Sequence, residues 1–253
     1  MIIDILTLFP KMFEDFLQTS IIGRAITNNK LQVNIINIRD FSNDKNKRVD
    51  DYIFGGGPGL LMKVQPLLKA LNYLKKENSH VVLLSPRGKT YNQNKAKELL
   101  KIEHLILICG HYEGIDERFF KYIDEFISIG DYILTGGEIP AMAIVDSLSR
   151  LIKGVINDES SVSESFEDNL LEYPQYTFPR VIDGDKVPEI LLSGNEAGIR
   201  KWRKKKSLEL TIKYREDLIN KRGLSESDLK LLNEDEKWMD EIIHKAKKII
   251  NKE

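Results

Sequence analysis

The first part of the chain, to about residue 155, alternates between short apolar runs and helical patterns. Several of the runs are apolar throughout, as expected for strands that are covered on both faces. The runs predict strands at residues 2–8, 33–38, 81–84, 105–109 and 126–129. The intervening patterns predict helices at residues 11–26, 65–75, 92–100, 115–122 and 140–152. Strands that alternate with helices predict an α/β domain with a parallel sheet.

The pattern changes after residue 156. Residues 157–168 are polar, acidic and rich in serine, which is typical of a flexible linker. A loop-rich stretch with several prolines follows, and then amphipathic patterns at residues 217–220, 225–232 and 236–250. We therefore expect three parts, which are a sheet domain at 1–156, an interdomain linker at 157–170 and a smaller, mainly helical C-terminal domain at 171–253.

The composition is that of a globular protein, because 42% of the 253 residues are hydrophobic and 30% are charged. The single cysteine, Cys109, excludes an internal disulfide framework and indicates a reducing compartment. No apolar run approaches the roughly 20 residues of a membrane helix. The apolar N-terminus carries Asp4 and lacks a basic start, so it predicts a buried strand rather than a signal peptide. We expect a cytoplasmic protein without a membrane partner.

Charge is distributed unevenly along the chain. The net charge is −1, which argues against strong nucleic-acid binding by the chain as a whole. Residues 200–222, however, contain ten Lys or Arg residues against three acids, and six of these cations surround Trp202 within residues 200–206. The basic segment is either a solvated helix face or a surface that neutralises nucleic-acid phosphates.

Glycines lie at the ends of three predicted strands, in residues 85–88, 110–114 and 130–137. Ligands of parallel α/β sheets bind outside the carboxyl ends of the strands. The three loops therefore predict a pocket formed largely by backbone, which suits a flat polar ligand such as an adenine nucleoside; the alternative is that each glycine only makes a turn. None of the loops is a dinucleotide fingerprint or a P-loop. A fourth glycine cluster, at 55–59, has no strand directly before it and favours a tight bend over a substrate loop.

The sequence contains few residue patterns that indicate a metal site or a catalytic nucleophile. The four histidines are scattered without zinc-ligand spacing, and no Ser-His-Asp arrangement can be proposed. Cys109 ends an apolar strand, where a cysteine is usually a core residue. The helix expected at 140–152 is apolar on more than one face and should be buried, either within the monomer or against a second subunit. Within it, Arg150 could pair with Asp146 at i,i+4 or contact an anion or a base.

Nine stretches in a fixed order, running nearly from end to end, match the motifs of a known family. They are IDILTLFP (3–10), SIIGRA (20–25), NIRDFSNDKNKRVDDYIFGGGPGLLMK (37–63), LLSPRGK (83–89), ICGHYEGIDER (108–118), SIGDYILTGGEIPAM (128–142), LLEYPQYT (170–177), VPEILLSGN (187–195) and IRKWR (199–203). On these motifs the chain resembles the bacterial tRNA (guanine-N1)-methyltransferases of the SPOUT class, which methylate the guanine at position 37.

The resemblance implies a trefoil-knotted sheet domain that binds S-adenosylmethionine, a homodimer with active sites at the subunit interface, and a C-terminal domain that grips the anticodon stem of tRNA. No periodicity argument would predict the knot, which general topology rules disfavour. The cofactor contacts that the resemblance implies are Leu84, Ser85, Pro86, Gly110, Tyr112, Glu113, Ile129, Gly130, Asp131, Tyr132, Ile133, Leu134, Gly136, Gly137 and Pro140.

The resemblance also implies the catalytic residues. The family base is the aspartate of an Asp-Ser-Phe motif, and the corresponding residue here is Glu164, followed by Ser165 and Phe166. Arg150 matches the family arginine that assists the base or polarises the guanine. The family reaction is magnesium-dependent, although this sequence shows no dedicated ion site. Other carboxylates that could replace Glu164 as the base are Asp158, Glu159, Glu167 and Asp168.

Two further positions depart from the family pattern. Phe178 stands where an arginine is frequent, with Arg180 nearby, and Glu196 stands where a histidine is common. These departures concern individual RNA contacts rather than the class of reaction. Two alternative functions remain. The protein could be a SPOUT methyltransferase that acts on a ribose 2′-hydroxyl or a ribosomal base, or a non-catalytic RNA-binding protein with the same fold.

Overall fold

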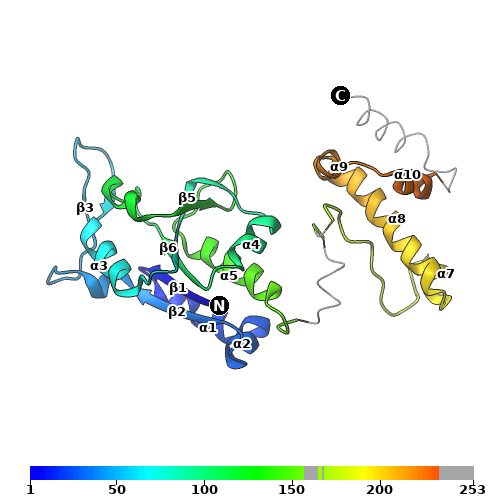
Figure 1. Cartoon of the computed structure of the whole chain (residues 1–253), viewed down its shortest axis with the longest axis horizontal. Coiled ribbons are helices and arrows are strands. Elements are labelled where there is room, and N and C mark those ends of the chain that lie inside the picture. The colour runs from blue at the N-terminus through cyan, green and yellow to red at the C-terminus, as the bar shows by residue number, and fades with distance from the viewer. Residues whose placement is uncertain (157–164, 167, 234–253) are drawn as a thin grey trace. The chain divides into compact units, whose positions relative to one another are not determined.

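The computed structural model describes residues 1–156, 165–166 and 168–233 (Figure 1). The chain divides into two compact units, Met1–Ser161 and Val162–Glu253. No helix among the described residues is both long enough and apolar enough to cross a membrane.

The N-terminal unit is built on a five-stranded sheet in the order β2-β1-β6-β5-β7. All of its strand pairs are parallel, which confirms the predicted α/β architecture with a parallel central sheet. The central strand β6 is buried at every position, because it is apolar throughout and covered on both faces. The strands are β1 (Ile2–Thr7), β2 (Gln32–Asn37), β5 (Ser79–Thr90), β6 (His104–Cys109) and β7 (Glu125–Ser128).

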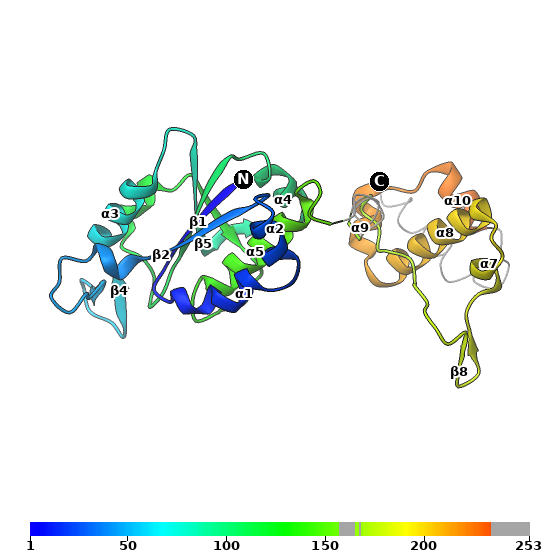
Figure 2. The same ribbon diagram turned by 90° about the horizontal axis from the view of Figure 1, so that it is seen from below.

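Helices cover both faces of this sheet (Figures 1 and 2). Alternate residues of β6 point to opposite faces, so Leu105 and Leu107 belong to one apolar cluster and Ile106 and Ile108 to the other. The first cluster includes residues of α2, α4 and α5, and the second includes residues of α3 and η3. The helices of this unit are η1 (Pro10–Phe13), α1 (Glu14–Gln18), α2 (Ser20–Thr27), η2 (Ile38–Phe41), α3 (Val64–Leu74), α4 (Gln93–Leu99), η3 (Glu117–Tyr122) and α5 (Glu138–Leu151).

Several boundaries differ from the prediction. The helix expected at residues 11–26 is interrupted, since Thr19 is extended and Ser20 has φ 55°. The break lets α2 fold closely against the end of α1, where a Cβ on Gly23 would overlap the carbonyl of Gln18. The segment expected as a helix at 115–122 forms the 3₁₀ helix η3.

Strand β5 runs beyond its predicted end at Leu84. It pairs with β7 up to Leu84, shifts register, and pairs with β7 again at Lys89 and Thr90. A Cβ on Gly88 would overlap the backbone of Ile127, so only glycine permits this close approach of the two strands.

A short antiparallel hairpin, formed by β3 (Asp50–Tyr52) and β4 (Leu60–Met62), was not predicted. The expectation that no strand precedes the glycine cluster was therefore wrong. Strands of three residues give too little alternation to be recognised in a sequence. The cluster at 55–59 connects the two strands, and its four glycines all have positive φ, between 81° and 127°.

Polar side chains form a hydrogen-bonded row at the amino edge of the sheet. Asp4 Oδ1 accepts from Asn34 Nδ2 at 2.7 Å, and Asp4 Oδ2 lies 2.8 Å from His104 Nε2. The other ring nitrogen, Nδ1, lies 2.7 Å from Ser79 Oγ, which also accepts the N–H of Lys76. A Ser-His-Asp row therefore exists that sequence reasoning did not find. It lies at the edge opposite the carboxyl ends of the strands, and it satisfies the buried polar groups of Asp4 and His104.

The C-terminal unit contains a small hairpin and four helices among its described residues. Among the described residues, its buried core consists of Leu170, Leu208, Ile212, Ile219 and Leu232. The patterns at 217–220 and 225–232 lie in helices, whereas the pattern at 236–250 lies outside the described residues. The elements are β8 (Val181–Ile182), β9 (Asp185–Lys186), α7 (Glu189–Leu192), α8 (Glu196–Tyr214), α9 (Glu216–Arg222) and α10 (Glu226–Leu232).

Candidate functional site

Three loops leave the sheet side by side at its carboxyl edge. Leu84 of β5 pairs with Cys109 of β6 and with Ile127 of β7, so these three strands reach the edge in register. Beyond this point the chain continues from Ser85 as the register-shifting segment of β5, and as loops from Gly110 and from the end of β7. Most of the predicted cofactor residues therefore belong to these three adjacent segments, the strand-end loops, although they come from distant parts of the sequence.

The loop at 110–114 is held at several points. Glu113 donates its N–H to the carbonyl of Leu60 at 3.0 Å, and Gly114 donates its N–H to the carbonyl of His111 at 3.2 Å. Tyr112, between His111 and Glu113, has φ +59°, which is unusual for a residue with a side chain. A backbone kept in this region is restrained by its surroundings. The loop is thus tied both to β4 and to itself by backbone hydrogen bonds.

Gly110 has free space beside it. A Cβ built on Gly110 would make only ordinary contacts, 3.8 Å from Ile115 Cδ1 and 3.9 Å from the carbonyl oxygen of Leu84. Packing within the unit therefore does not require glycine at this position. A ligand that approaches the backbone closely would require it.

The loop after β7 is shaped by a serine and two glycines. The Ser128 hydroxyl donates to the carbonyl of Gly130 at 3.0 Å, and Gly130, with φ +153°, donates its N–H back to Ser128 Oγ at 3.2 Å. Further along, Gly137 donates its N–H to the carbonyl of Gly110 at 3.1 Å. A Cβ on Gly137 would lie 2.5 Å from Cys109 Cα, so this glycine is required by the packing of α5 against β6.

A buried carboxylate, Glu138, directly follows Gly137 at the start of α5. It is 2% exposed. Thr7 Oγ1 donates to its Oε1 at 2.6 Å, and His111 Nε2 lies 2.8 and 2.7 Å from its two oxygens. Burial would raise the pKa of Glu138, but the hydrogen bonds from His111 and Thr7 outweigh burial and hold that pKa below its usual value. Glu138 is therefore ionised at neutral pH.

Thr7, His111 and Glu138 were not among the predicted site residues. Thr7 and Glu138 are 131 positions apart, and periodicity does not reveal such a pair. Two features of the sequence could have indicated them. Thr7 is a polar residue at the end of an apolar strand, and Glu138 is an acid directly after two glycines at the start of a helix, where a carboxylate is favoured.

The predicted site residues do not all lie together in the structure. Pro140 lies in the first turn of α5, near the loops, whereas Arg150 lies in its last turn. Ten residues of helix separate them by about 15 Å along the axis. Glu164, the predicted base, lies outside the described residues, as do Asp158, Glu159 and Glu167. The residues that the structure gathers on the three strand-end loops and the start of α5 are Leu84, Ser85, Pro86, Gly110, Tyr112, Glu113, Ile129, Gly130, Asp131, Tyr132, Ile133, Leu134, Gly136, Gly137 and Pro140.

The basic segment at 200–222 lies on α8 and α9, and its part around Trp202, on α8, combines cations with aromatic rings. The rings of Trp202 and Tyr176 are 6.4 Å apart, and the Arg203 guanidinium lies 4.8 Å from the centre of the Tyr173 ring. Two other cations pair with acids on the same helix, Arg200 with Glu196 at 3.7 Å and Lys206 with Glu209 at 2.6 Å. The segment is therefore more than a set of solvated charges.

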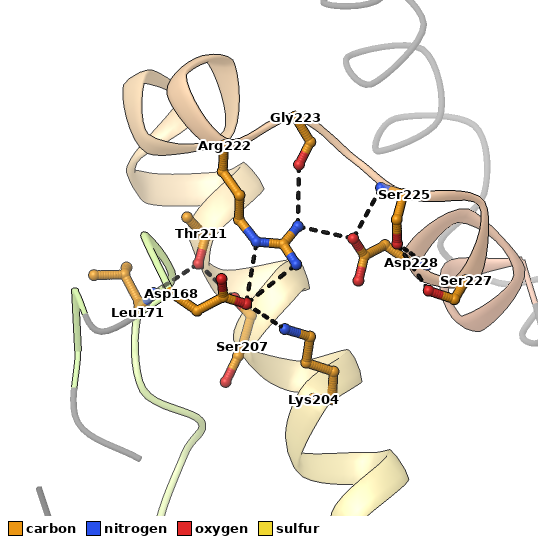
Figure 3. A network of polar contacts seen from close by, with 10 residues as sticks. All are labelled: Asp168, Leu171, Lys204, Ser207, Thr211, Arg222, Gly223, Ser225, Ser227 and Asp228. Carbon is orange, nitrogen blue, oxygen red and sulfur yellow. Dashed lines mark hydrogen bonds and ion pairs between the residues drawn. The ribbon is translucent and has the colours of Figure 1, made fainter. Parts of the chain in front are cut away.

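Asp168 joins the chain that enters this unit to two of its helices (Figure 3). Its Oδ2 accepts from Lys204 of α8 at 2.9 Å and from Arg222 of α9 at 3.2 Å. Arg222 in turn donates to Asp228 of α10 at 2.8 Å. The hydrogen bond from Lys204 lowers the pKa of Asp168. A carboxylate with a lowered pKa that is held by two cations is a poor proton acceptor.

Asp228→Asn is expected to lower the free energy of unfolding of the C-terminal unit by roughly 1.5–3 kcal/mol, the usual contribution of a hydrogen bond to a charged group. Asp228 and Arg222 are both largely buried, with side chains 5% and 16% exposed. Both tryptophans of the chain, Trp202 and Trp238, belong to this unit, so urea unfolding followed by tryptophan fluorescence reports on it. Asp185→Asn, on the exposed strand β9, is the matched control and should leave the midpoint unchanged.

The same measurement should show a loss of stability in acid. Burial of Asp228 would raise its pKa, but hydrogen bonds from Arg222 and Ser225 outweigh burial and lower it, as Lys204 does for Asp168. A carboxyl group with a folded-state pKa below its ordinary 3.8 stabilises the fold above that pH and loses this contribution as pH falls through the lowered value. We therefore expect stability to fall below about pH 4, and less steeply in Asp228→Asn than in the wild type.

Within the described part of the chain, no group of three or more His, Cys, Asp or Glu side chains could hold a metal ion. At the carboxyl edge the structure thus brings together backbone of three strand ends and one buried carboxylate, Glu138, in a unit of the mixed α/β class.

Comparison with known proteins gives the family. The pattern of the family described as "tRNA (Guanine-1)-methyltransferase TrmD" matches residues 1–221. The chain belongs to this family.

Three relatives, each named "tRNA (guanine-N(1)-)-methyltransferase", match nearly end to end. The chain is 57% identical over 236 residues to the protein of Caldanaerobacter subterraneus subsp. tengcongensis, covering 92% of this chain and 98% of the relative. It is 56% identical over 234 residues to that of Clostridium botulinum strain Hall, covering 92% and 97%. It is 52% identical over 240 residues to that of Dictyoglomus turgidum, covering 94% and 98%.

Proposed function

We propose that the protein transfers a methyl group from S-adenosylmethionine to N1 of the guanine at position 37 of tRNA. Membership of the family and the names of the relatives support the reaction class. The single observation in this chain that carries the proposal is the register of three loops at the carboxyl edge, with Gly110 open beside them. The position within the tRNA rests on the family resemblance.

The methyl donor is proposed to bind along the loops at 84–86, 110–113 and 129–137. These residues fit an adenine nucleoside, since they offer backbone N–H and carbonyl groups at an edge where parallel sheets bind ligands. Gly110 has no packing requirement for glycine, and Gly130 has positive φ next to the same edge. When bound, the donor supplies an activated methyl on a sulfonium. The protein's part is to orient that methyl and to exclude water.

Guanine N1 carries a proton and is a poor nucleophile, so a base must remove this proton as the new N1–carbon bond forms and the carbon–sulfur bond breaks. Alignment of acceptor and methyl can lower a barrier by about 7–11 kcal/mol, and a general base adds about 10²–10⁴-fold. We assign the base to Glu164, because it occupies the acid position before Ser165 and Phe166. Asp168 is the least suited of the alternative carboxylates, since two cations hold it and its pKa is lowered.

A homodimer with shared active sites is part of the proposal. Arg150 is about 15 Å along α5 from Pro140, so a second copy is the natural source of an arginine at the cofactor loops. Large apolar side chains are exposed on the loops and helices of the carboxyl edge, as expected for a surface that another subunit covers. They are Phe9, Met12, Tyr132, Ile133 and Ile139, which are between 45% and 84% exposed.

The trefoil knot of the SPOUT class is also proposed. Two observations support it. β5 pairs with β7 both before and after residues 85–88, and the chain after β7 comes back to the loop after β6, where Gly137 donates its N–H to the carbonyl of Gly110. The C-terminal unit is proposed to bind the tRNA stem through α8, where Trp202 lies against the ring of Tyr176 and Arg203 lies over the ring of Tyr173. For magnesium we propose no site on the described residues; the ion would accompany the RNA.

The test is to incubate the protein with S-adenosylmethionine and unmodified tRNA and to digest the product to nucleosides. We expect 1-methylguanosine from position 37, and its loss when that guanine is replaced. A ribose-methylated nucleoside, or methylation of ribosomal RNA only, would support the other SPOUT activities. If methyl transfer is absent across a broad pH range while tRNA binds, the protein is an RNA-binding protein without catalysis.

A further inference from the structure

The most enclosed polar cluster at the carboxyl edge consists of Thr7, His111 and Glu138. Thr7 is fully buried and Glu138 is 2% exposed. None of the three is among the proposed cofactor contacts or the proposed catalytic residues. The cluster nevertheless includes a residue of the loop at 110–114 and the residue that directly follows Gly137, and its side chains come from three segments that are distant in sequence.

We propose that Thr7 and Glu138 are positioning residues for binding of the methyl donor, and that they act through His111 on the loop at 110–114. This inference rests on the proposed function, since it concerns the same cofactor site. It adds residues of β1 and α5 that do not touch the donor but determine the conformation of the loop that does.

Glu138 is the junction of the three segments. A carboxylate only accepts hydrogen bonds, so His111 must donate its Nε2–H to Glu138. Thr7 Oγ1 donates to Oε1 of the same carboxylate and accepts the N–H of Phe9 at 2.9 Å. The hydroxyl of Thr7 therefore links the end of β1 to the start of α5, and Glu138 links both to the loop after β6.

The His111 ring is enclosed on several sides. The ring of Phe9 lies 4.8 Å from it, and a Cβ on Gly136 would overlap it. The backbone N–H of His111 also donates to Met62 Sδ at 3.3 Å. With ring and backbone both held, His111 serves as a fixed anchor at the start of the loop.

The strained residue of the loop follows this anchor directly. Tyr112 has φ +59°, and the next residue, Glu113, is tied to Leu60 through its N–H. Left-handed backbone persists only where the surroundings determine it from both sides. Release of the His111 side chain removes the restraint that precedes Tyr112 in the chain. The loop can then relax toward ordinary φ values, and the backbone and side chains of Tyr112 and Glu113 leave the positions at which they meet the donor.

The expected consequence is a loss of donor binding rather than of chemistry. Residues that only position the cofactor loop change the affinity for S-adenosylmethionine, while turnover at saturating donor depends on the base and on alignment of the guanine. A role confined to folding would instead lower stability without this split between KM and kcat.

The experiment compares Thr7→Val with Thr7→Ser in the full-length protein. Thr7→Val keeps the shape but removes the hydroxyl, so Glu138 loses a donor and the Phe9 N–H loses its acceptor. We expect the Kd for S-adenosylmethionine by calorimetry, and the KM, to rise by roughly tenfold. The value of kcat and the Kd for tRNA should change less than about threefold. Thr7→Ser retains the hydroxyl and should bind the donor nearly as the wild type does.

Thr27→Val is the matched control, because it removes a hydroxyl in the same unit that bonds only to the carbonyl of Gly23. It should leave donor affinity unchanged. Amide hydrogen exchange gives an independent readout, since the N–H groups of Glu113 and Gly114 should exchange faster in Thr7→Val. If Thr7→Val does not fold, Glu138→Gln, which keeps the size of the side chain, is compared in the same way.

The outcomes separate this inference from the proposed function. If the wild type does not bind S-adenosylmethionine, the proposed function fails. If the wild type binds it and a folded Thr7→Val or Glu138→Gln binds it equally well, the positioning role is wrong while the function stands. Equal losses in Thr7→Val and Thr27→Val would also overturn the inference, because they would show a general effect on the fold.

Discussion

Glu164→Gln is expected to lower single-turnover methyl transfer to tRNA by roughly tenfold or more, and to leave the affinity for S-adenosylmethionine nearly unchanged. Glutamine keeps the size of the side chain but cannot take the N1 proton. The proposed cofactor contacts lie on the strand-end loops and the start of α5, so they should not depend on this substitution. Rapid-quench kinetics with saturating enzyme and donor measure the chemical step, and calorimetry measures donor binding.

The control is Glu159→Gln, a change of the same kind in the same acidic segment. It should keep the rate of the chemical step. Wild-type turnover in Glu164→Gln would remove Glu164 from the mechanism and move the search to the remaining carboxylates of the segment. A tenfold loss in both variants would instead show that the charge of the segment matters, not one base.

The second large effect is expected for Gly130→Val, which should abolish measurable binding of S-adenosylmethionine. Gly130 has φ +153°, a conformation that a β-branched residue adopts only at a high energetic cost. The added Cβ would also overlap the ring of Tyr132, one of the proposed cofactor contacts. Calorimetry with up to millimolar donor tests this directly, and binding of normal affinity would contradict it.

Gly184→Val is the control for the backbone effect. Gly184 also has positive φ, 92°, but lies in the β8–β9 hairpin of the C-terminal unit, with nothing within 4 Å of an added Cβ. Gly184→Val should lower the free energy of unfolding of the C-terminal unit without changing the affinity for S-adenosylmethionine. A similar loss of binding in both variants would show that the effect of Gly130→Val is not specific to the site.

The sequence predicted the parts of the fold that depend on uniform apolar runs. The run at 105–109 is buried at every position in β6, and its neighbours in the sheet were found in the same way. The order of the strands was not predictable, because it depends on which faces fit together across the whole unit. The break at Thr19 and Ser20 was missed for a related reason, since the close approach of α2 to α1 overrides a continuous helical pattern.

The candidate site was predicted where glycines mark it and missed where tertiary contacts create it. Gly110 and Gly130 stand out in the sequence, and the family resemblance gives the residues around them. His111 was regarded as one of several scattered histidines, because its partner Glu138 is 27 residues away in the sequence, and Thr7, which donates to Glu138, is 131 residues from Glu138. A long-range hydrogen bond has no periodic signature in the sequence, so only the structure reveals the cluster.

The sole cysteine of the chain, Cys109, has a consequence for experiments in solution. Its side chain is completely buried in β6, and burial, with a smaller contribution from Glu138, raises the pKa of its thiol well above the ordinary value. Because the thiolate is the reactive form, maleimides and nitroxide reagents should leave the native protein unlabelled. Two introduced cysteines, one on the surface of each unit, would then be the only residues of the chain that react with dyes. Energy transfer between the dyes could follow the distance between the two units while tRNA is added, without removal of the natural residue.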